Sequence, residues 1–178
     1  MVGSRRIPFP AQEDLAMKDP LERLSALLAE PGQPLRIYRA MEEETRALAG
    51  HRLFTLLYVD GAEVARVHSS RPAEYPVSGR KPMGPTPWGA HVLAGRRSFL
   101  GRDVAAIRWA FFDAPLIEGM GLGSVVNVPV VHDGATIGTM NLLDAEFHYR
   151  EEHVAPLERL APVLVPAFLA ARFAARAS

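Results

Sequence analysis

Apolar residues recur with a helical period in the first part of the chain. Asp19-Pro20 is typical of a helix start, because an aspartate can cap the first turn and proline fits the first helical position. A stripe of leucines follows, so we expect a leading helix over residues 19–32. Residues 34–48 again place apolar side chains on one helical face, which predicts a second helix that stops at Gly50.

Two later stretches have the pattern of β-hairpins. Residues 52–59 and 62–69 are rich in β-forming side chains and flank Asp60-Gly61. Residues 121–146 contain two apolar runs joined by Asp133-Gly134. An Asp-Gly pair between such runs is typical of a two-residue hairpin turn. Each pair of runs is therefore predicted to form two adjacent antiparallel strands.

The second hairpin carries amides among its apolar residues, and its register decides where they lie. Counting back from a two-residue turn at Asp133-Gly134 places Val126 opposite Asn141 and Asn127 opposite Met140. Because partners across two strands share a face of the sheet, this register predicts that the two asparagines point to opposite faces. A slip of one residue would exchange their positions.

The region between the hairpins has no sustained period. Residues 70–87 are rich in proline and glycine, which is typical of an ordered loop or a lid. After them we expect a short helix over residues 88–93, a short strand over residues 98–100 and another helix over residues 104–111.

The last part of the chain, residues 150–177, predicts a long terminal helix. Its apolar positions are spaced alternately by four and three residues, as in a packing seam: Leu157, Ala161, Leu164, Phe168 and Ala171. Pro162 and Pro166 lie inside this stretch, so we expect a kink or a break. One face of a domain cannot completely hide both this seam and the stripe of residues 34–48. The pattern therefore predicts a homodimer built on the terminal helices.

The order of these elements predicts an α+β fold. Its economical form is a central antiparallel sheet with the N- and C-terminal helices on one face. The loops and short helices between the hairpins then cover the other face, where a small-molecule pocket forms readily. Residues 19–178 are expected to form this single domain, preceded by a flexible arm of residues 1–18.

Composition narrows the classes of protein. The 178 residues hold 20 basic and 20 acidic side chains, and this balance argues against nucleic acid as a partner. There is no cysteine, which removes thiolate chemistry, and the six histidines are scattered, so we expect neither a metal site nor a cofactor. No apolar run reaches the roughly 20 residues of a membrane span and no secretion signal is visible. We therefore expect a soluble cytoplasmic protein.

The chain resembles the GAF domain family. The resemblance lies in the stretches SVVNVPVVHDGATIGTMNLLD and EFHYREEHVAPLERLAPVL, and it covers roughly residues 34–173 in order and spacing. The resemblance implies a PAS-like fold and a small-molecule ligand in a bacterial-type sensory or signalling protein. It also implies dimers formed through the first and last helices.

Three departures from the family narrow what the resemblance implies. Without cysteine, the chain cannot be a methionine sulfoxide reductase of the cysteine-dependent type, nor can it hold a covalent bilin. It lacks the Asn-Lys-x-Asp motif of cyclic-nucleotide GAF domains. No attached effector domain is recognisable, so we expect a free-standing module.

The candidate ligand contacts come from the proline-rich segment and the second hairpin. Tyr75 and Trp88 offer flat apolar surface with a polar tip, which suits an aromatic ligand. Arg80 follows Gly79, where backbone amides can be exposed, and its guanidinium suits a carboxylate. We therefore expect an aromatic or carboxylated ligand. The full set is Tyr75, Arg80, Trp88, His91, Arg108, Trp109, Ser124, Thr139 and Asn141. Ser124, Val126 and Thr139 are expected to share the pocket face with Asn141, and Asn127 to face the helices.

Purely structural roles, without ligand binding, remain alternatives for several of these residues. The proline-rich segment is equally typical of a stiff surface loop with solvated charges, and Trp109 is more typical of a core than of a pocket. The leading function is a ligand-binding sensory module. The alternatives are an enzyme without a thiol, whose catalytic groups would be His68, His91, Arg80 and Asp113, and a subunit that only dimerises or docks a partner.

Overall fold

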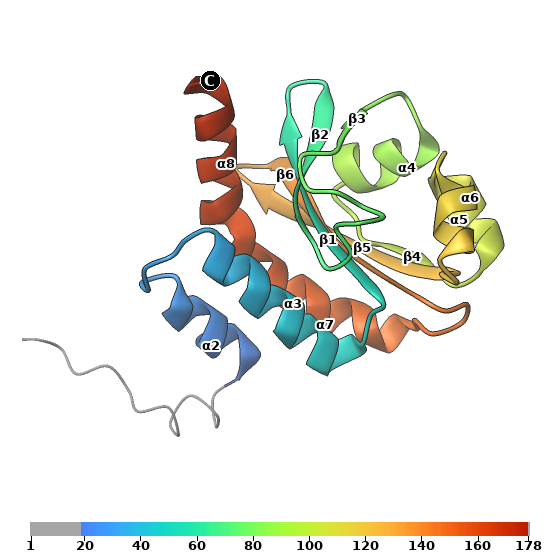
Figure 1. Ribbon diagram of the computed structural model, residues 1–178, viewed down its shortest axis with the longest axis horizontal. Coiled ribbons are helices and arrows are strands. Elements are labelled where there is room, and N and C mark those ends of the chain that lie inside the picture. The colour runs from blue at the N-terminus through green and yellow to red at the C-terminus, as the bar shows by residue number, and fades with distance from the viewer. Residues whose placement is uncertain (1–18, 178) are drawn as a thin grey trace, which may run out of the picture.

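A computed structural model describes residues 19–177, so the expected arm of residues 1–18 lies outside the described residues. Within residues 19–177, six strands form one antiparallel sheet in the order β3-β2-β1-β6-β5-β4 (Figure 1). The strands are β1 (Leu53–Asp60), β2 (Glu63–Ser69), β3 (Arg80–Pro82), β4 (Phe99–Gly101), β5 (Ser124–His132) and β6 (Ala135–Asp144). The predicted α+β fold with a central antiparallel sheet is confirmed.

The two leading helices form where the sequence predicts them. Helix α2 (Pro20–Leu27) begins after Asp19, whose Oδ1 accepts a hydrogen bond from the Leu21 amide at 2.8 Å, and it is shorter than expected. Helix α3 (Leu35–Ala49) ends at Gly50, which has a φ of 70°. Glycine adopts this left-handed region without steric cost, so it ends the helix cleanly.

The terminal helical segment is broken, as its prolines predict. A 3₁₀ turn, η2 (Glu151–His153), leads into α7 (Val154–Leu160), and a second one, η3 (Ala161–Leu164), separates α7 from α8 (Val165–Ala177). Pro162 lies inside η3, so the break coincides with a residue that cannot donate the helical hydrogen bond.

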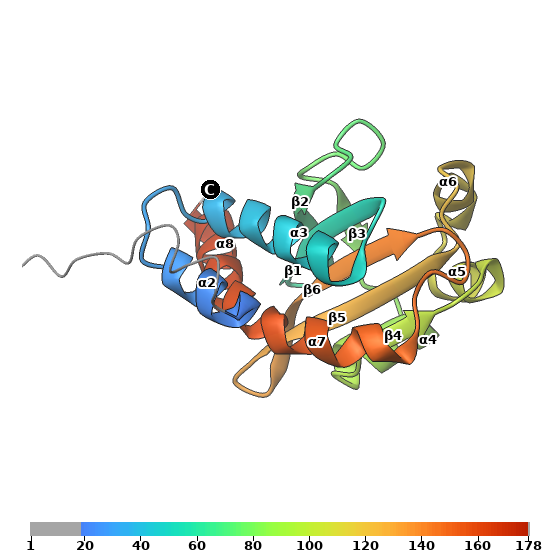
Figure 2. The same ribbon diagram turned by 90° about the horizontal axis from the view of Figure 1, so that it is seen from below.

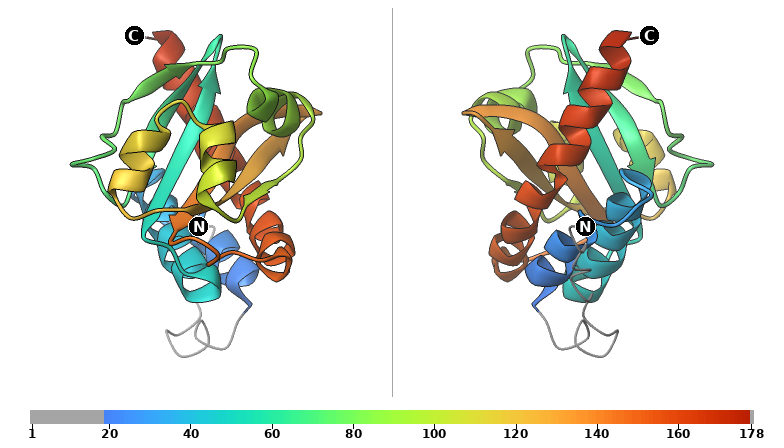
Figure 3. Two further views of the ribbon diagram at one scale, coloured as in Figure 1. Left: turned by 90° about the vertical axis from the view of Figure 1, so that its right-hand side faces the viewer. Right: turned by 90° about the vertical axis from the view of Figure 1, so that its left-hand side faces the viewer.

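The helices α2, α3, α7 and α8 cover one face of the sheet, which we call the helix face (Figure 2; Figure 3). The predicted seam packs here within the domain, with Leu157, Leu164 and Phe168 completely buried. Gly138 of β6 permits the close approach of α8, because a Cβ atom there would lie 2.4 Å from the Phe168 ring and 2.4 Å from the Leu57 carbonyl oxygen. By length and composition alone the stretch Glu151–Ala175 could cross a membrane, but a helix that packs on its own sheet passes the same test.

Short helices cover the opposite face, which we call the pocket face (Figure 3, left). They are α4 (Pro87–Gly89), the π-helical turn η1 (Ala90–Ala94), α5 (Val104–Ala110) and α6 (Ala114–Gly119). A second, smaller core under α5 and α6 contains Ile107, Ile117 and Leu143. Two elements were not predicted: α6, and β3, which pairs with β2 at the sheet edge within the proline-rich segment.

The register predicted for the second hairpin is wrong by one residue. The turn itself is as expected, with His132 opposite Ala135. An irregularity follows, because Val131 pairs with Thr136 but Val130 pairs with Gly138, which leaves Ile137 as an extra residue in β6. This β-bulge shifts all the pairs beyond it.

The shift brings the two amides together. Asn127 pairs with Asn141, so both lie on the pocket face, whereas Val126 pairs with Leu142 and packs in the core of the helix face. The predictions that Asn127 faces the helices and that Ser124 and Val126 share the face of Asn141 are therefore corrected.

Candidate ligand pocket

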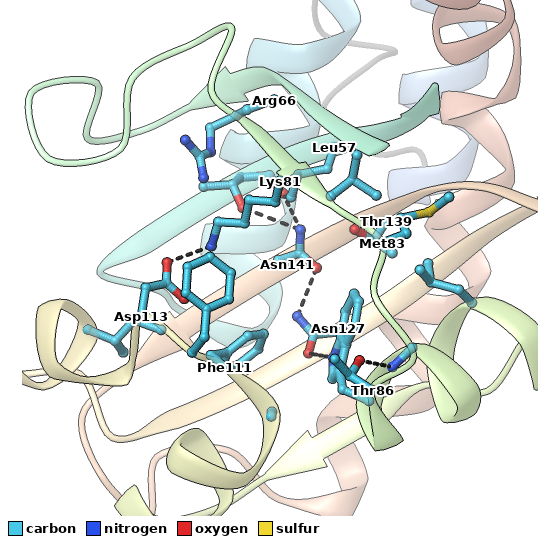
Figure 4. A pocket seen from close by; sticks show the side chains of 18 of the residues that line it. Leu57, Arg66, Lys81, Met83, Thr86, Phe111, Asp113, Asn127, Thr139 and Asn141 are labelled. Carbon is cyan, nitrogen blue, oxygen red and sulfur yellow. Dashed lines mark hydrogen bonds and ion pairs between the residues drawn. The ribbon is translucent and has the colours of Figure 1, made fainter. Parts of the chain in front are cut away.

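A cavity of about 120 Å³ lies between the pocket face and the segments that cover it (Figure 4). On the same measure a single water needs about 10–15 Å³, so the cavity has room for a small organic molecule. Its floor comes from the central strands β1, β5 and β6 and comprises Leu53, Thr55, Leu57, Asn127, Thr139, Asn141 and Leu143. These strands supply the floor because their side chains alternate between the two faces.

Four residues form an unbroken hydrogen-bonded chain along the floor, which we call the amide chain: Trp88, Asn127, Asn141 and Thr55. Trp88 Nε1 donates to Asn127 Oδ1 at 2.9 Å, and Asn127 Nδ2 donates to Asn141 Oδ1 at 2.8 Å. Asn141 Nδ2 then lies 3.3 Å from Thr55 Oγ1 and 3.4 Å from its carbonyl oxygen. Both asparagines are buried, so their amides need partners, and the amide chain provides them.

Three charged side chains and a tyrosine gather at one end of the pocket, which we call the cationic end: Arg66, Lys81, Asp113 and Tyr75. Lys81 Nζ lies 2.5 Å from Asp113 Oδ2, and the Tyr75 hydroxyl donates to the same oxygen at 2.8 Å. Arg66 Cζ lies 4.6 Å from the centre of the Tyr75 ring, a cation–π distance. Lys81 lies on β3 and Asp113 precedes α6, so this cluster joins the sheet edge to the covering helices.

The pKa values at the cationic end follow from burial and from these contacts. Burial alone would raise the pKa of Asp113, but the hydrogen bond and charge of Lys81, with the Tyr75 hydroxyl, outweigh it and lower that pKa. Burial lowers the pKa of Arg66, partly offset by Tyr75 and Asp113. Burial and the neighbouring Asp113 raise the pKa of Tyr75. At neutral pH the cluster therefore contains two cations and one carboxylate.

The walls between the amide chain and the cationic end are mainly apolar. The ring centres of Trp88 and Phe111 lie 6.0 Å apart, and Met83, Leu93 and Ile117 also line the cavity. Phe112, at the edge of the pocket, is 79 % exposed. A ligand that fills this space would therefore touch carbon over most of its surface.

Four of the nine predicted contact residues line the pocket: Tyr75, Trp88, Thr139 and Asn141. The other five do not. Arg80 is exposed at the sheet edge, where Nη1 lies 2.7 Å from Asp60 Oδ2 and 3.1 Å from Glu63 Oε2. The strand β3 alternates, so Lys81 turns inward where Arg80 turns outward.

The remaining four lie outside the cavity for distinct reasons. His91 Nε2 lies 3.0 Å from the carbonyl oxygen of Ser98. Arg108 points outward and forms a bidentate ion pair with Glu118. Trp109 stacks on Phe99, with ring centres 5.3 Å apart, and is 51 % exposed, so it contributes neither to the pocket nor to the main core. Ser124 is buried, and its hydroxyl donates to the Ala145 carbonyl oxygen at 2.6 Å.

Arg66 and Asn127 line the pocket but were not among the contact residues predicted from the sequence. A signal for Arg66 was available: it is two residues after Val64 in a strand, at a position expected to face inward, and it is charged. No comparable signal existed for Asn127, because its face depends on the bulge at Ile137.

The four catalytic groups expected for an enzyme do not converge. Only Asp113 lines the cavity. His68 lies 2.7 Å from Glu42 of α3, and Arg80 and His91 are engaged as described above. Among residues 19–177 there is also no group of three or more histidine, aspartate or glutamate side chains that could hold a metal ion.

Comparison with known proteins adds independent observations. The family model described as "GAF domain" matches residues 36–168. The comparison with curated proteins gives no match.

Among solved structures, the GAF domain of a sensor histidine kinase from Bacillus halodurans superimposes with a TM-score of 0.66 at 13 % identity, over 80 % of this chain and 98 % of that one. The GAF domain of an Acinetobacter phosphoenolpyruvate-protein phosphotransferase gives 0.68 at 12 %, over 92 % and 97 %. Free methionine-R-sulfoxide reductase from Neisseria meningitidis, in complex with its substrate, gives 0.66 at 19 %, over 95 % and 98 %. At these identities the likeness concerns the fold.

Proposed function

Because the chain belongs to the GAF domain family, we propose that it is a soluble cytoplasmic sensory module that binds a small metabolite in the pocket of Figure 4. The observation that carries this proposal is the cavity itself, which combines an apolar wall with a buried amide chain and a charged end. Ligand sites typically combine a mainly apolar lining with a few placed polar groups.

The ligand is a small molecule with an aromatic or carboxylated group. The aromatic part of this proposal rests on the Trp88 and Phe111 rings, which line the cavity side by side. The sensory part is supported by the fold shared with the GAF domain of a sensor histidine kinase. The signal would be passed on through the segments that cover the pocket, because a ligand contacts these as well as the sheet.

Native mass spectrometry of the purified protein tests the binding proposal. We expect a copurified small molecule that is released on denaturation, or, from a metabolite library, compounds that raise the melting temperature. The matched control is Ala110→Trp, since Ala110 lines the cavity at the end of α5 and a large ring there would fill it. If the parent and this variant bind the same compounds equally, the pocket is not the binding site.

An enzyme that acts on a small metabolite, without a thiol, is the second candidate. It ranks lower because, of its four expected catalytic groups, only Asp113 lines the pocket among the residues the structure describes. Conversion of the copurified compound on prolonged incubation with the protein would reverse this order.

We also propose a homodimer, formed through the outer surface of α8. The buried seam is already used within the domain, so the dimer rests instead on Leu169 and Phe173, four residues apart, of which Phe173 is 77 % exposed. Light scattering should give twice the chain mass for the parent and a lower mass for Phe173→Glu. A parent that is monomeric at micromolar concentration would contradict the proposal.

A further inference from the structure

Among residues 19–177, one positive charge that lines the pocket has no direct carboxylate partner. The charged residues that line the cavity are Arg66, Lys81 and Asp113. Lys81 is neutralised by Asp113 at 2.5 Å. The guanidinium of Arg66 lies over the Tyr75 ring and Nη1 donates to the Pro76 carbonyl oxygen at 2.9 Å, whereas Asp113 acts on it through its charge without a direct ion pair. Within the part of the chain that the structure describes, the lining therefore carries a net charge of +1, located on Arg66.

Arg66 is also buried, which makes the missing partner significant. The residue is 5 % exposed, and its Nε atom is buried without a hydrogen-bond partner. Leaving a buried charged donor unmatched is costly, so such groups usually have a counter-charge. An anion in the cavity, which Arg66 lines, would supply the opposite charge.

The surrounding backbone is shaped around this guanidinium. Arg66 pairs with Leu57 of β1, which lines the cavity, so both side chains are on the pocket face. On the other side, a Cβ atom at Gly79 would lie 2.6 Å from Arg66 Nη1, so any larger residue there would require the end of the Arg66 side chain to move. The guanidinium is thus held between a fixed turn and the Tyr75 ring, with its Nε edge unmatched.

We propose, on the basis of the pocket function above, that the ligand is a monoanionic carboxylate with an apolar, ring-sized body, and that Arg66 receives the carboxylate. Figure 4 shows Arg66, Lys81 and Asp113 at one end of the pocket and Asn127 and Thr86 at the other. The planar guanidinium matches a planar carboxylate. One uncompensated cation matches one negative charge, which favours a carboxylate over a dianionic phosphate.

The body of the ligand would extend from Arg66 toward the aromatic wall. Between these two ends the cavity is bounded by Leu57, Leu143 and Phe111, which offer no charge. Arg80, the anion-binding residue expected from the sequence, has no part in this, because its guanidinium is already paired with Asp60 and Glu63 outside the cavity.

The test uses three probes with the same carbon skeleton: 3-phenylpropionate, 3-phenylpropanamide and L-phenylalanine. The fluorescence of Trp88 reports binding in a Trp109→Phe background, since the sequence has two tryptophans and only Trp88 lines the cavity. We expect the acid to bind about 10- to 100-fold more tightly than the amide, the range for a charge-assisted hydrogen bond. The added ammonium of phenylalanine should weaken binding.

Arg66→Gln is the decisive variant. It should lose the preference for the acid and keep the affinity for the amide, and its ligand-free melting temperature should not fall, because an unmatched buried charge is removed. Arg66→Lys should keep part of the preference. Arg80→Gln is the matched control, an arginine on the neighbouring strand whose loss should leave all three affinities unchanged.

Several results would overturn the inference while leaving the pocket function intact. They are equal affinity of the parent for acid and amide, tighter binding of phenylalanine than of the acid, and an Arg66→Gln variant that melts earlier but still prefers the acid. The last would show that Arg66 only supports the turn at Gly79. Failure of all three probes to bind would also overturn it, whereas the pocket function is judged separately by the mass spectrometry.

Discussion

The two faces of the sheet differ in how completely they are packed. On the helix face, Leu56, Met140 and Phe168 are fully buried in a continuous core. On the pocket face, the same strands border a cavity. Two of the three buried polar atoms without a partner in residues 19–177, Arg66 Nε and Asp113 Oδ1, also belong to residues that line it. Beside the sheet, the helix face thus presents a filled core, whereas the pocket face carries unfilled space and unmatched polar groups.

The largest expected effect comes from two neighbours on β1. Leu56 points into the helix-face core, and Leu57 lines the cavity. Leu56→Ala should lower the free energy of unfolding by about 2–5 kcal/mol, because it opens a void in a filled core. Leu57→Ala should cost about 1 kcal/mol or less, because the side chain already borders empty space. Chemical denaturation of both variants checks this, and equal losses would contradict the contrast between the faces.

A smaller loss is expected from the amide chain. Asn141→Leu removes the acceptor of Asn127 Nδ2 and should cost about 1–3 kcal/mol, the usual penalty for a buried donor left unmatched. The double variant Asn127→Leu/Asn141→Leu should lose less stability than the sum of the two single variants, since both partners are then apolar. Strict additivity in denaturant titrations would show that the two amides do not depend on each other.

Acid should affect the two faces in different pH ranges. His51 lies against Phe54 of the helix-face core, and burial lowers its pKa. The stability that depends on its neutral form is therefore fully present above pH 6.5 and is lost as the pH falls below that value. Asp113 at the pocket has a lowered pKa, so its contribution is present above 3.8 and is lost below it. In thermal melts, His51→Gln should weaken the first pH dependence and Asp113→Asn the second. An unchanged profile in either variant would remove that group as the cause.

The smallest effect is expected at the sheet edge. Arg80→Gln removes two ion pairs that are open to solvent, and such pairs contribute little. Its melting temperature should be indistinguishable from that of the parent. A clear decrease would mean that the short strand β3 depends on these pairs and that the pocket side is less tolerant than the comparison implies.

Local patterns were sufficient to predict most of the fold. Asp19 and Gly50 set the ends of helices, and the Asp133-Gly134 pair made the expected turn, because each acts through its own backbone. The edge strand β3 escaped prediction because three residues that end in proline resemble a loop unless β2 is beside them.

The site was harder to predict because it depends on register. A single extra residue, Ile137, exchanged the expected positions of Asn127 and Val126 relative to Asn141. Arg80 was expected at the pocket, but in β3 it is the next residue, Lys81, that lines the cavity. An arginine in a loop-like segment gives no sign of which way it turns. Alternation along β2 would have pointed to Arg66.

The amide chain has a direction, and the groups at its two ends both set it. An indole N–H can only donate, so Asn127 must turn its oxygen toward Trp88, its amino group then meets the oxygen of Asn141, and the amino group of Asn141 is left for Thr55. Trp88 belongs to α4, above the pocket, whereas both amides belong to the sheet. If α4 lifts, the Asn127 oxygen loses its donor, whereas Asn141 keeps its orientation because the Thr55 carbonyl oxygen, 3.4 Å from its Nδ2, can only accept. The position of α4 therefore determines whether an arriving molecule meets a free amide oxygen on the floor.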